Sequence, residues 1–513
     1  MSIASFVRSL MIWGLLLGGM LVAQTNYQEP YRPQVHFSPR QHWTNDPNGL
    51  VYFHGEYHLF FQFNPEGDEW GHMSWGHAVS KDLLHWRELP VAIPEQGDEM
   101  VFTGSVVVDR NNTSGFCGQG KECLVAIYTG HRHSPGQTRQ TQNLAYSLDD
   151  GRTWIRYAQN PVLDLHLPDF RDPSVSWDEK EGHWRMAVSL PSQHKVRFYA
   201  SPDLKHWTEL SDFGPAGAVG GAWECPDLLQ IPGESGTPSM WVLKVGLNPG
   251  SPQGGSGEQY FLGQFDGKRF VPSESPGSHG WTNYGKDDYC AISFNGIPPT
   301  EKPVLMGWMN NWQYAAQLPT SPWRGQMSLP RRLSLVHDQD GLSIRQDPVI
   351  DALHGEHAAI QRKPHGEIAV QEAPFEIDLR FEEPLEQAFG IRLYTDQEHW
   401  TEIGFDRSRR EFYMDRTMSG KDVSRDFPGK TVGPLAEGRP FDLRVIVDWS
   451  SVEAYAQGDT IAMTNLIFPS SKKSRIVLFA SGKSVAVSGD VWSLRSIWNV
   501  ESQGEAPDVR VRP

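Results

Sequence analysis

Short β-prone runs, each ended by Gly, Pro, Asn or Asp, follow one another through residues 35–340, and no long pattern of helical period interrupts them. A turn motif recurs between these runs: SKDLLHW at Ser80–Trp86 and SPDLKHW at Ser201–Trp207, with the related SLDDGRTW at Ser147–Trp154. Repeated β-units with a recurrent turn are typical of propeller blades. At the usual ~40–60 residues per blade, this stretch holds about five to seven blades, and the spacing of the three motifs favours five.

The pattern changes after residue 370 to strict alternation of apolar and polar residues, which is typical of strands with one buried face. It predicts nine short strands: Phe375–Phe381, Phe389–Thr395, Thr401–Asp406, Glu411–Arg416, Phe441–Asp448, Ser451–Ala456, Ile461–Phe468, Ser474–Ala480 and Val485–Trp492. Such a series fits a two-sheet β-sandwich. The sequence therefore predicts an all-β chain, with a five-bladed β-propeller at 30–345, a linker at 346–370 and a β-sandwich at 371–500. The last dozen residues are predicted to be a frayed tail.

Residues 1–24 are predicted to be a secretory signal peptide. Arg8 supplies a positive start, Leu10–Val22 is apolar but too short to span a bilayer, and Ala23 is a small residue before a cleavage point. A signal-anchor helix is the alternative. The mature protein is thus expected to be secreted, into the medium or the periplasm, and to have no membrane contact.

Charge and composition narrow the classes of partner. The formal net charge of −16 argues against nucleic acid and anionic membranes, whose binding needs basic patches. The 19 Trp favour carbohydrate recognition, because indole faces stack on sugar rings, although about half of them are expected in the core. Cys117 and Cys123 flank a Gly-rich loop and can pair after export, whereas Cys225 and Cys290 are interpreted as separate buried thiols. No Cys/His spacing fits zinc, so neither a metal nor an organic cofactor is predicted.

Three acidic residues stand in motifs that combine a carboxylate with an aromatic residue and Pro. They are Asp46 in WTNDPNG at Trp43–Gly49, Asp172 in DFRDP at Asp169–Pro173, and Glu224 in GAWECPD at Gly221–Asp227. Each motif alone reads as a turn or a core ion pair, since Asn, Asp, Pro and Gly are common turn formers. In a propeller, however, loops from successive blades converge at one end of the axis. The three carboxylates can then share one pocket.

Glycoside hydrolysis needs such a set of carboxylates. One of them attacks or activates water, and another, as an acid, protonates the leaving oxygen. Closely spaced carboxylates raise one another's pKa, which keeps the acid protonated near neutral pH. Arg171, beside Asp172, is expected to hold Asp172 ionised and to donate to a sugar hydroxyl.

In this order the motifs resemble glycoside hydrolase family 32, which comprises invertases, exo-inulinases, levanases and related β-fructofuranosidases. Further matching segments are FQFNP at Phe61–Pro65, WGHAVS at Trp75–Ser80, FTGS at Phe102–Ser105, MGWMNNW at Met306–Trp312 and the stretch Ser451–Pro469. The resemblance covers nearly all of the mature chain. It implies a five-bladed propeller followed by a β-sandwich that packs against it.

The resemblance also implies roles for individual residues. Asp46 would be the nucleophile, Glu224 the general acid/base, and Asp172 would stabilise the transition state through fructose hydroxyls, in a reaction that retains configuration. The positions that match the pocket around the terminal fructose are Asn45, Gln62, Trp70, Phe102, Ser105, Arg171 and Trp308. Two departures are visible: Thr44 stands where Met is usual, and Cys290 where a small Ala is usual.

The substrate expected from the resemblance is a fructan. The segment GGSGEQYF at Gly254–Phe261 resembles exo-acting inulinases and levanases, so we expect release of terminal fructose from levan or inulin, with sucrose as a smaller substrate. An endo-levanase or endo-inulinase and a fructosyltransferase are alternatives on the same scaffold. A non-catalytic glycan-binding propeller, a sialidase and an inverting arabinan hydrolase are alternatives from other classes. The protein is expected to be a monomer or a dimer.

Overall fold

The structure is a computed structural model that describes residues 27–498, except 135–136, 274–278, 339–340, 364, 383–386 and 483–484. Its elements are β-strands and three short 3-10 turns, at Pro191–Gln193, Ala315–Gln317 and Asp351–Leu353, so the predicted all-β class is confirmed. The predicted signal peptide at 1–24 and the predicted C-terminal tail lie outside the described residues. Within the described part of the chain, no helix has the length and apolar character needed to cross a membrane.

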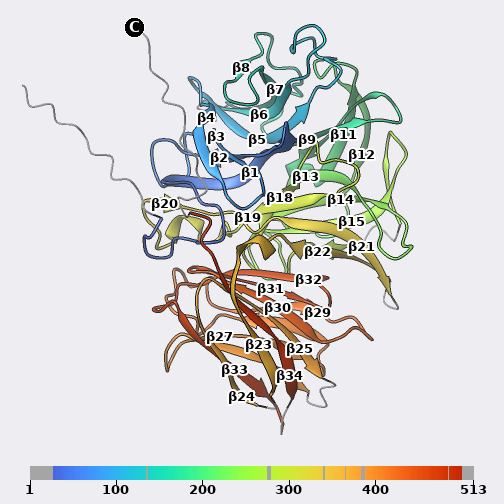
Figure 1. The fold of residues 1–513 in the computed structure, drawn as a ribbon. Coiled ribbons are helices and arrows are strands. Elements are labelled where there is room, and N and C mark those ends of the chain that lie inside the picture. Colours follow the sequence, from blue (N-terminus) through green and yellow to red (C-terminus); the bar gives the residue numbers. More distant parts are fainter. Residues whose placement is uncertain are drawn as a thin grey trace, which may run out of the picture.

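Residues 27–348, here called the N-terminal part, contain five sheets, which lie within residues 42–348 and follow one another along the chain (Figure 1). The first sheet has the order β20 (Trp323–Arg324), β1 (His42–Phe53), β2 (Glu56–Phe63), β3 (Ser74–Ser80), β4 (Arg87–Ile93). The second runs β5 (Glu99–Val108), β6 (Leu124–Ser134), β7 (Gln137–Ser147), β8 (Ile155–Arg156). The third runs β9 (Arg171–Asp178), β10 (His183–Leu190), β11 (Lys195–Ser201), β12 (Thr208–Phe213).

The last two sheets of the N-terminal part complete the series. The fourth runs β13 (Ala222–Ile231), β14 (Met240–Asn248), β15 (Gly257–Phe265), β16 (Phe270–Pro272), and β15 also pairs with β17 (Gly280–Trp281). The fifth runs β18 (Tyr289–Ser293), β19 (Val304–Trp308), β21 (Arg331–Asp338), β22 (Gly341–Pro348). Neighbouring strands are antiparallel except that β20 joins β1 in parallel, which brings a late segment of the chain back to the first sheet.

The strands β1, β5, β9, β13 and β18 are the innermost strands of the five sheets. Each contacts the innermost strand of the next sheet, and β18 contacts β1 again, so together they form a closed ring. We call them the ring strands. Because they surround one axis, side chains that point from them toward that axis come close together although they are far apart in sequence.

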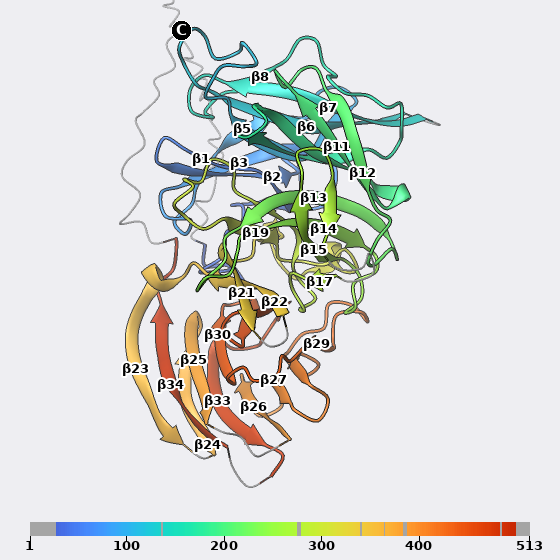
Figure 2. The ribbon, with the colours of Figure 1, turned by 90° about the vertical axis from the view of Figure 1, so that its right-hand side faces the viewer.

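The C-terminal part consists of two six-stranded sheets, seen below the N-terminal part in Figure 2. One has the order β23 (His354–Lys363), β34 (Ala486–Leu494), β25 (Phe375–Glu382), β30 (Asp442–Val447), β31 (Ser451–Ala456), β32 (Ile461–Leu466). The other has the order β24 (Gly366–Glu372), β33 (Lys473–Ala480), β26 (Ala388–Tyr394), β27 (Trp400–Asp406), β28 (Glu411–Asp415), β29 (Lys430–Pro434). Leu379 and Val445 of the first sheet and Ile391 and Phe405 of the second belong to one buried apolar core.

All nine strands predicted after residue 370 correspond to strands of the structure, with small differences at their ends. The predicted linker at 346–370 is wrong, because β23 and most of β24 lie within it. Both are edge strands, and β29, which was not predicted, is an edge strand too. Edge strands bury few side chains and are often polar, so they lack the apolar alternation by which the other strands were found.

The two parts of the molecule are joined by buried polar contacts. The carboxylate of Asp448 accepts hydrogen bonds from the backbone N–H groups of Gln34 (2.8 Å) and Val35 (3.0 Å) and pairs with Nδ1 of His36 at 2.8 Å. Arg416 of the C-terminal part and Asp287 of the N-terminal part form a buried ion pair, with 2.6 Å between Nη1 and Oδ2. Since these groups are removed from water, the parts meet in a fixed interface.

All four cysteines form disulfides. Cys117 pairs with Cys123, as the sequence allowed. The interpretation of Cys225 and Cys290 as separate thiols is wrong, because they form the second disulfide, with their Cα atoms 5.3 Å apart. They lie 65 residues apart in sequence, on β13 and β18, and only the ring brings these strands together.

Candidate active site

The three predicted catalytic carboxylates lie on ring strands and not in the connecting loops where the sequence placed them. The pairing of each ring strand with the next strand of its own sheet contains a register shift. These shifts lie between Thr44 and Pro47, between Val101 and Gly104, between Arg171 and Ser174, between Glu224 and Asp227, and between Tyr289 and Ile292. A bulge of this kind bends a strand and turns a side chain out of the sheet's alternation. Repeated on five strands, it directs polar side chains toward the common axis.

Backbone strain accompanies these bulges. Asp172, Cys225 and Cys290 have φ values of 65°, 47° and 49°, in the left-handed region that non-glycine residues rarely adopt. Such conformations persist only where surrounding contacts hold them, and they are concentrated at functional sites. Here they occur beside the predicted catalytic residues.

The three predicted catalytic carboxylates meet in one cavity of about 140 Å³. Its lining residues are Asn45, Asp46, Gln62, Trp70, Phe102, Thr103, Arg171, Asp172, Glu224 and Trp312. Eight of these were singled out from the sequence, whereas Thr103 and Trp312 were not. The ring therefore brings together carboxylates from β1, β9 and β13.

Asp46 has one engaged and one free carboxylate oxygen. Thr103 Oγ1 donates to Oδ2 at 2.8 Å, while the buried Oδ1 has no hydrogen-bond partner within the described chain. Burial raises the pKa of Asp46 to about 6; a hydrogen bond from Asn45 opposes the shift, and the charge of Glu224 adds to it. A desolvated carboxylate with a free oxygen is suited to nucleophilic attack.

Glu224 is held by two donors from different strands. Arg171 donates to Oε1 from Nε at 3.1 Å and from Nη2 at 2.9 Å, and the Tyr289 hydroxyl donates to Oε2 at 2.5 Å. Burial, together with the charge of Glu224, raises the pKa of Tyr289 well above its ordinary value, so this residue stays a neutral phenol. Tyr289 was not predicted as a site residue, because a Tyr in an apolar run is typical of a buried core.

Asp172 differs from its expected state. The guanidinium of Arg171 binds Glu224 and Asp169 and lies 4.0 Å from Asp172 Oδ2. The carboxylate of Asp172 accepts a hydrogen bond from the Cys225 N–H at 3.0 Å. Burial raises its pKa, and the charges of Glu224 and Asp46 add to this effect, while Arg171 only partly opposes it. Arg171 thus favours the ionised form of Asp172, as expected, but burial outweighs this effect.

Aromatic side chains form the walls of the cavity. Trp70, whose side chain is 46% exposed, contacts Phe102 edge to face, with ring centroids 6.1 Å apart. Trp312 lines the opposite part of the pocket and packs on Trp43 and Trp308, at 6.0 and 4.8 Å between centroids. Partly exposed aromatic rings of this kind can stack on a sugar.

Two predicted sugar contacts lie outside the cavity lining. Trp308 is fully buried behind Trp312. Ser105 is buried as well, where its hydroxyl donates to the Pro173 carbonyl at 3.0 Å and accepts from the Val175 N–H at 2.9 Å, so that it joins β5 to β9. Trp308 ends β19, whereas Trp312 lies in the turn that follows this strand. The sequence alone could not show which of the two Trp of one motif reaches the cavity.

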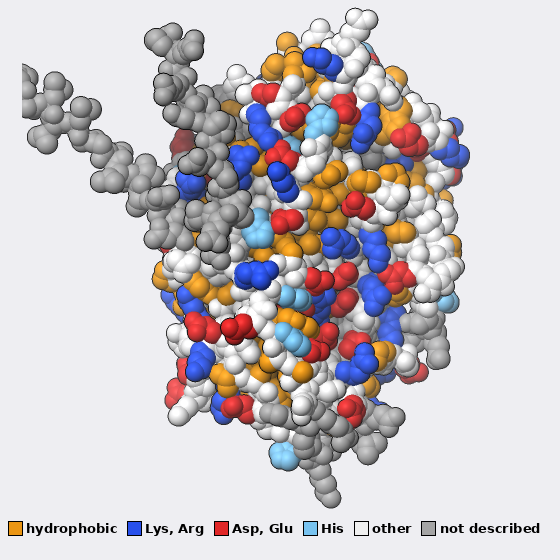
Figure 3. Space-filling model, viewed as in Figure 1, with side chains coloured by type: hydrophobic (Ala, Val, Ile, Leu, Met, Phe, Trp, Pro, Cys, Tyr) orange, Lys and Arg blue, Asp and Glu red, His pale blue; other side chains and the backbone are white. Residues whose placement is uncertain are grey.

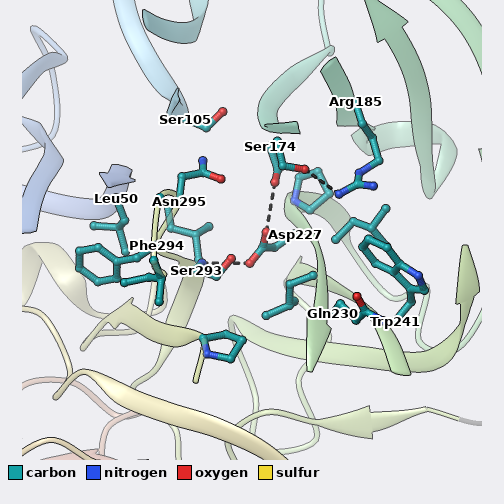
Figure 4. Close-up of a pocket in the computed structure, with 18 of the residues that line it drawn as sticks. Leu50, Ser105, Ser174, Arg185, Asp227, Gln230, Trp241, Ser293, Phe294 and Asn295 are labelled. Atoms are coloured by element: carbon teal, nitrogen blue, oxygen red, sulfur yellow. Dashed lines mark hydrogen bonds between the residues drawn. The ribbon is translucent and has the colours of Figure 1, made fainter. Parts of the chain in front are cut away.

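A second, larger cavity of about 430 Å³ lies next to the first and shares Thr103 and Asp172 with it. Figure 4 shows polar residues around this space, among them Ser105 of β5, Ser174 of β9 and Asn295, which follows β18. Asp227 accepts hydrogen bonds there from Ser174 Oγ (3.1 Å) and the Ser293 N–H (2.9 Å). Thr103 and Asp172 thus border both cavities.

One group of possible metal ligands occurs among the described residues: an oxygen of Asp46 and the sulfur atoms of Cys225 and Cys290, all within 4.8 Å of one another. The two sulfurs are bonded to each other and offer no thiolate. The arrangement is suited instead to covalent acid/base chemistry on a sugar, with a free carboxylate oxygen facing a second carboxyl group held by proton donors.

Comparison with known proteins gives consistent matches over nearly the whole chain. The family model for the glycosyl hydrolases family 32 N-terminal domain matches residues 36–348, and that for the family 32 C terminal matches residues 343–493. The chain is 42% identical to a levanase of Bacillus subtilis (strain 168), over 92% of this chain and 72% of the levanase. It is 41% identical to an extracellular exo-inulinase of Aspergillus awamori, over 92% of this chain and 96% of the inulinase.

Solved structures give the same result. The crystal structure of exo-inulinase from Aspergillus awamori has a TM-score of 0.87 and 39% identity, over 92% of this chain and 100% of that one. The structure of fructofuranosidase from Schwanniomyces occidentalis, complexed with fructose, has a TM-score of 0.80 and 35% identity, over 91% and 98% of the two chains.

Proposed function

The chain belongs to glycosyl hydrolase family 32, and from this premise we propose that it is a retaining, exo-acting β-fructosidase that releases terminal fructose from levan or inulin and cleaves sucrose. The observation that carries the proposal is the meeting of Asp46, Asp172 and Glu224 in one small cavity with aromatic walls. A cavity of this size suits one terminal sugar residue better than an internal stretch of a polymer. The relatives named levanase and exo-inulinase support the choice of substrate.

The proposed mechanism assigns attack on fructose C2 to Asp46. Its Oδ1 is the unengaged oxygen, so it can form the bond to C2 without first breaking a hydrogen bond. Glu224 protonates the departing oxygen and then accepts a proton from water, which hydrolyses the covalent fructosyl-enzyme. Retention predicts that the two carboxyl groups lie about 5–5.5 Å apart.

Asp172 and the other lining residues position the sugar. Asp172 binds fructose hydroxyls, and protonation of its buried carboxyl would let it donate as well as accept. Asn45, Gln62, Arg171 and Trp312 supply the remaining polar and stacking contacts. Ser105 and Trp308, which are buried behind the lining, support the pocket from outside.

We assign the five N-terminal sheets to a five-bladed β-propeller over residues 30–345 and the two C-terminal sheets to a β-sandwich. The closed ring of five innermost strands supports the first assignment. The apolar core shared by two six-stranded sheets supports the second. The sandwich then begins with β23, within the stretch expected to be a linker.

Secretion is proposed on two grounds. Both disulfides would persist in an oxidising compartment, and a relative with 41% identity is named as extracellular. A signal peptide at residues 1–24 would direct the export. The protein is proposed to act as a monomer or a dimer, which light scattering of the purified enzyme would distinguish.

Time-resolved digests of levan, inulin, sucrose and arabinan, separated by thin-layer chromatography, test the proposal. Exo action predicts free fructose from the first time point, with the polymer shortening slowly. Early oligofructans would indicate endo action, and longer products formed from sucrose would indicate fructosyl transfer. Absence of cleavage of every fructan would contradict the assignment. NMR of the first anomer released would test retention.

A further inference from the structure

The Cys225–Cys290 disulfide crosses between two sheets directly beside the catalytic carboxylates. Cys225 follows Glu224 on β13, and Cys290 follows Tyr289 on β18, and these strands belong to different sheets. The two residues that the cysteines follow are themselves joined by the short Tyr289–Glu224 hydrogen bond. A covalent bond and a hydrogen bond thus connect the same two strands at neighbouring positions.

The same disulfide also reaches the other two carboxylates. The Cys225 N–H donates to Asp172 Oδ2, and the Cys225 sulfur lies 3.9 Å from Asp46 Oδ2 and 3.8 Å from Asp172 Oδ2. Any movement of the Cys225 backbone would therefore change the surroundings of all three acidic residues.

Both cysteines adopt left-handed backbone conformations at the bulges of their strands. These conformations are unfavourable for residues with a Cβ and need support from the surrounding structure. A disulfide supplies it, because it ties the side chains of both strained residues to each other. The bulges in turn set the direction of Glu224 and Tyr289.

We propose that the Cys225–Cys290 disulfide is a positioning element of the active site, which keeps the bulges of β13 and β18 in place so that Tyr289 and Arg171 orient the Glu224 carboxyl. This inference rests on the proposed function, because it concerns the residue assigned as acid/base. The cysteines act through Glu224 and are not themselves catalytic.

Opening the disulfide would add a titratable group to the site. A dithiol reductant attacks one sulfur to form a mixed disulfide, and its second thiol then displaces the protein sulfur. The net reaction transfers two electrons and two protons, and yields two cysteine thiols and one oxidised dithiol. The larger cavity is lined by Cys225 and gives the reductant a route to it. The new Cys225 thiol would face Asp46, Asp172, Glu224, Arg171 and Tyr289.

A thiol at this place would alter the pH dependence of activity. It can donate a weak hydrogen bond to an ionised carboxylate of Asp46 or Asp172, which favours the ionised form. As a thiolate at higher pH it would repel the same groups. A fall of kcat with KM nearly unchanged, and not the pH profile alone, distinguishes the positioning role from the effect of the new thiol.

The first test compares Cys290→Ala with the matched control Cys117→Ala/Cys123→Ala, which removes the other disulfide at a site outside both cavities. We expect kcat of Cys290→Ala on the best fructan to fall about tenfold to hundredfold, as misplacement by about 1 Å does, with KM within about twofold. The pH–activity profile should change as well, and the control should keep both kcat and profile. A Cys290→Ala enzyme with one titratable thiol and the kcat and pH profile of the wild type would overturn the proposal.

The second test opens the bond in folded protein, in case Cys290→Ala does not fold. The control variant retains only the Cys225–Cys290 disulfide, so dithiothreitol followed by maleimide labelling and mass spectrometry counts its opening directly. We expect kcat, measured before labelling, to fall in step with the number of thiols that the label counts, and to return when an unlabelled aliquot is reoxidised. Two labelled thiols per chain with unchanged kcat would contradict the proposal.

Failure of the proposed function can be told apart from failure of this inference. A wild-type enzyme that cleaves no fructan would refute the function, and the inference would then be judged on structure alone. A crystal structure of Cys290→Ala in which the Tyr289 hydroxyl still lies at hydrogen-bond distance from Glu224, with both bulges unchanged, would refute the positioning role.

Discussion

In the N-terminal part the ring strands are irregular where they meet, whereas in the C-terminal part the central ladders continue through the core without a register shift. The first region gathers carboxylates, left-handed residues and a disulfide at one level. The second buries mainly apolar side chains between its sheets. Figure 3 shows that both parts carry mixed charges on the face in view, so the difference lies inside the molecule.

The comparison shows where this protein tolerates unfavourable groups. Buried charge and strained backbone each cost stability, and the site assigned to chemistry combines buried carboxyl groups with three left-handed residues. The C-terminal part has a regular core that can stabilise the whole through the fixed interface. Substitutions in the two regions should therefore separate activity from stability.

The largest effect is expected for Asp46→Asn. Loss of the nucleophile should lower kcat by roughly 10⁴-fold or more, as removal of a covalent catalyst does elsewhere. The melting temperature should stay the same or rise, since the amide removes a buried charge. Kinetics and thermal unfolding on the same preparation would test this. Near-normal turnover would overturn the role given to Asp46, and Glu224→Gln provides the parallel case for the acid/base.

The opposite pattern is expected for Phe405→Ala in the C-terminal core. Its ring is fully buried between the two sheets, so truncation should lower the free energy of unfolding by about 3–5 kcal/mol. Denaturant unfolding gives this number, and kcat of the folded fraction at low temperature should remain that of the wild type. A large loss of kcat without a loss of stability would show that the two regions are not separable in this way.

A smaller effect is expected at the interface between the two parts, whose contribution to the free energy of unfolding should depend on pH. Burial alone would lower the pKa of His36, but the hydrogen bond to Asp448 and the ion pair with Glu453 outweigh it and raise the value to about 9. Because the folded-state pKa is above the unfolded value of about 6.5, this stability is fully present below pH 6.5 and is lost as pH rises through 9. The shift corresponds to about 3 kcal/mol.

Urea unfolding between pH 6.5 and 9.5 would measure this loss. His36→Gln should be less stable at pH 6.5 and should show little of the pH dependence. An equal dependence on pH in both proteins would mean that other groups are responsible.

The smallest expected effect is a shift in the acidic limb of the pH–activity profile. With its pKa raised to about 6, Asp46 should lose its nucleophilic form as pH falls through about 6. Thr103→Val removes a hydrogen bond that lowers this pKa, so the limb should move to higher pH. A wild-type limb near pH 4, the range of ordinary carboxyl groups, would contradict the assignment.

The same carboxyl predicts a pH dependence of stability in the same direction as that of His36, but in a more acidic window. Its pKa is higher in the folded than in the unfolded state, so between about pH 4 and 6 the folded state binds more protons. This contribution therefore favours folding more as pH falls through that window. Asp46→Asn should lack it.

Much of the fold could be predicted, because it follows from patterns among residues that are close together in the sequence. Alternation of apolar residues located all nine predicted strands of the C-terminal part, and runs broken by turn formers indicated the all-β class of the N-terminal part. The edge strands β23, β24 and β29 escaped this method, since few of their side chains are buried and no alternation marks them.

Less of the site could be predicted, even with the family resemblance. The motifs around Asp46, Asp172 and Glu224 pointed to residues that do share a cavity. They could not reveal that Trp312 lines it in place of Trp308, or that Tyr289 binds Glu224. The first fact depends on the path of the turn after β19, and the second on the bulge of β18, and both are properties of the assembled ring.

By itself, then, the sequence determined the all-β class, most strands and the residue types that carry the chemistry, because periodicity and turn propensity act between near neighbours in the chain. Only the tertiary structure decided that Cys225 pairs with Cys290, that Arg171 turns to Glu224, and that burial raises the pKa of Asp172. Each of these depends on contacts between segments tens of residues apart. Such contacts arise when the five ring strands close around one axis.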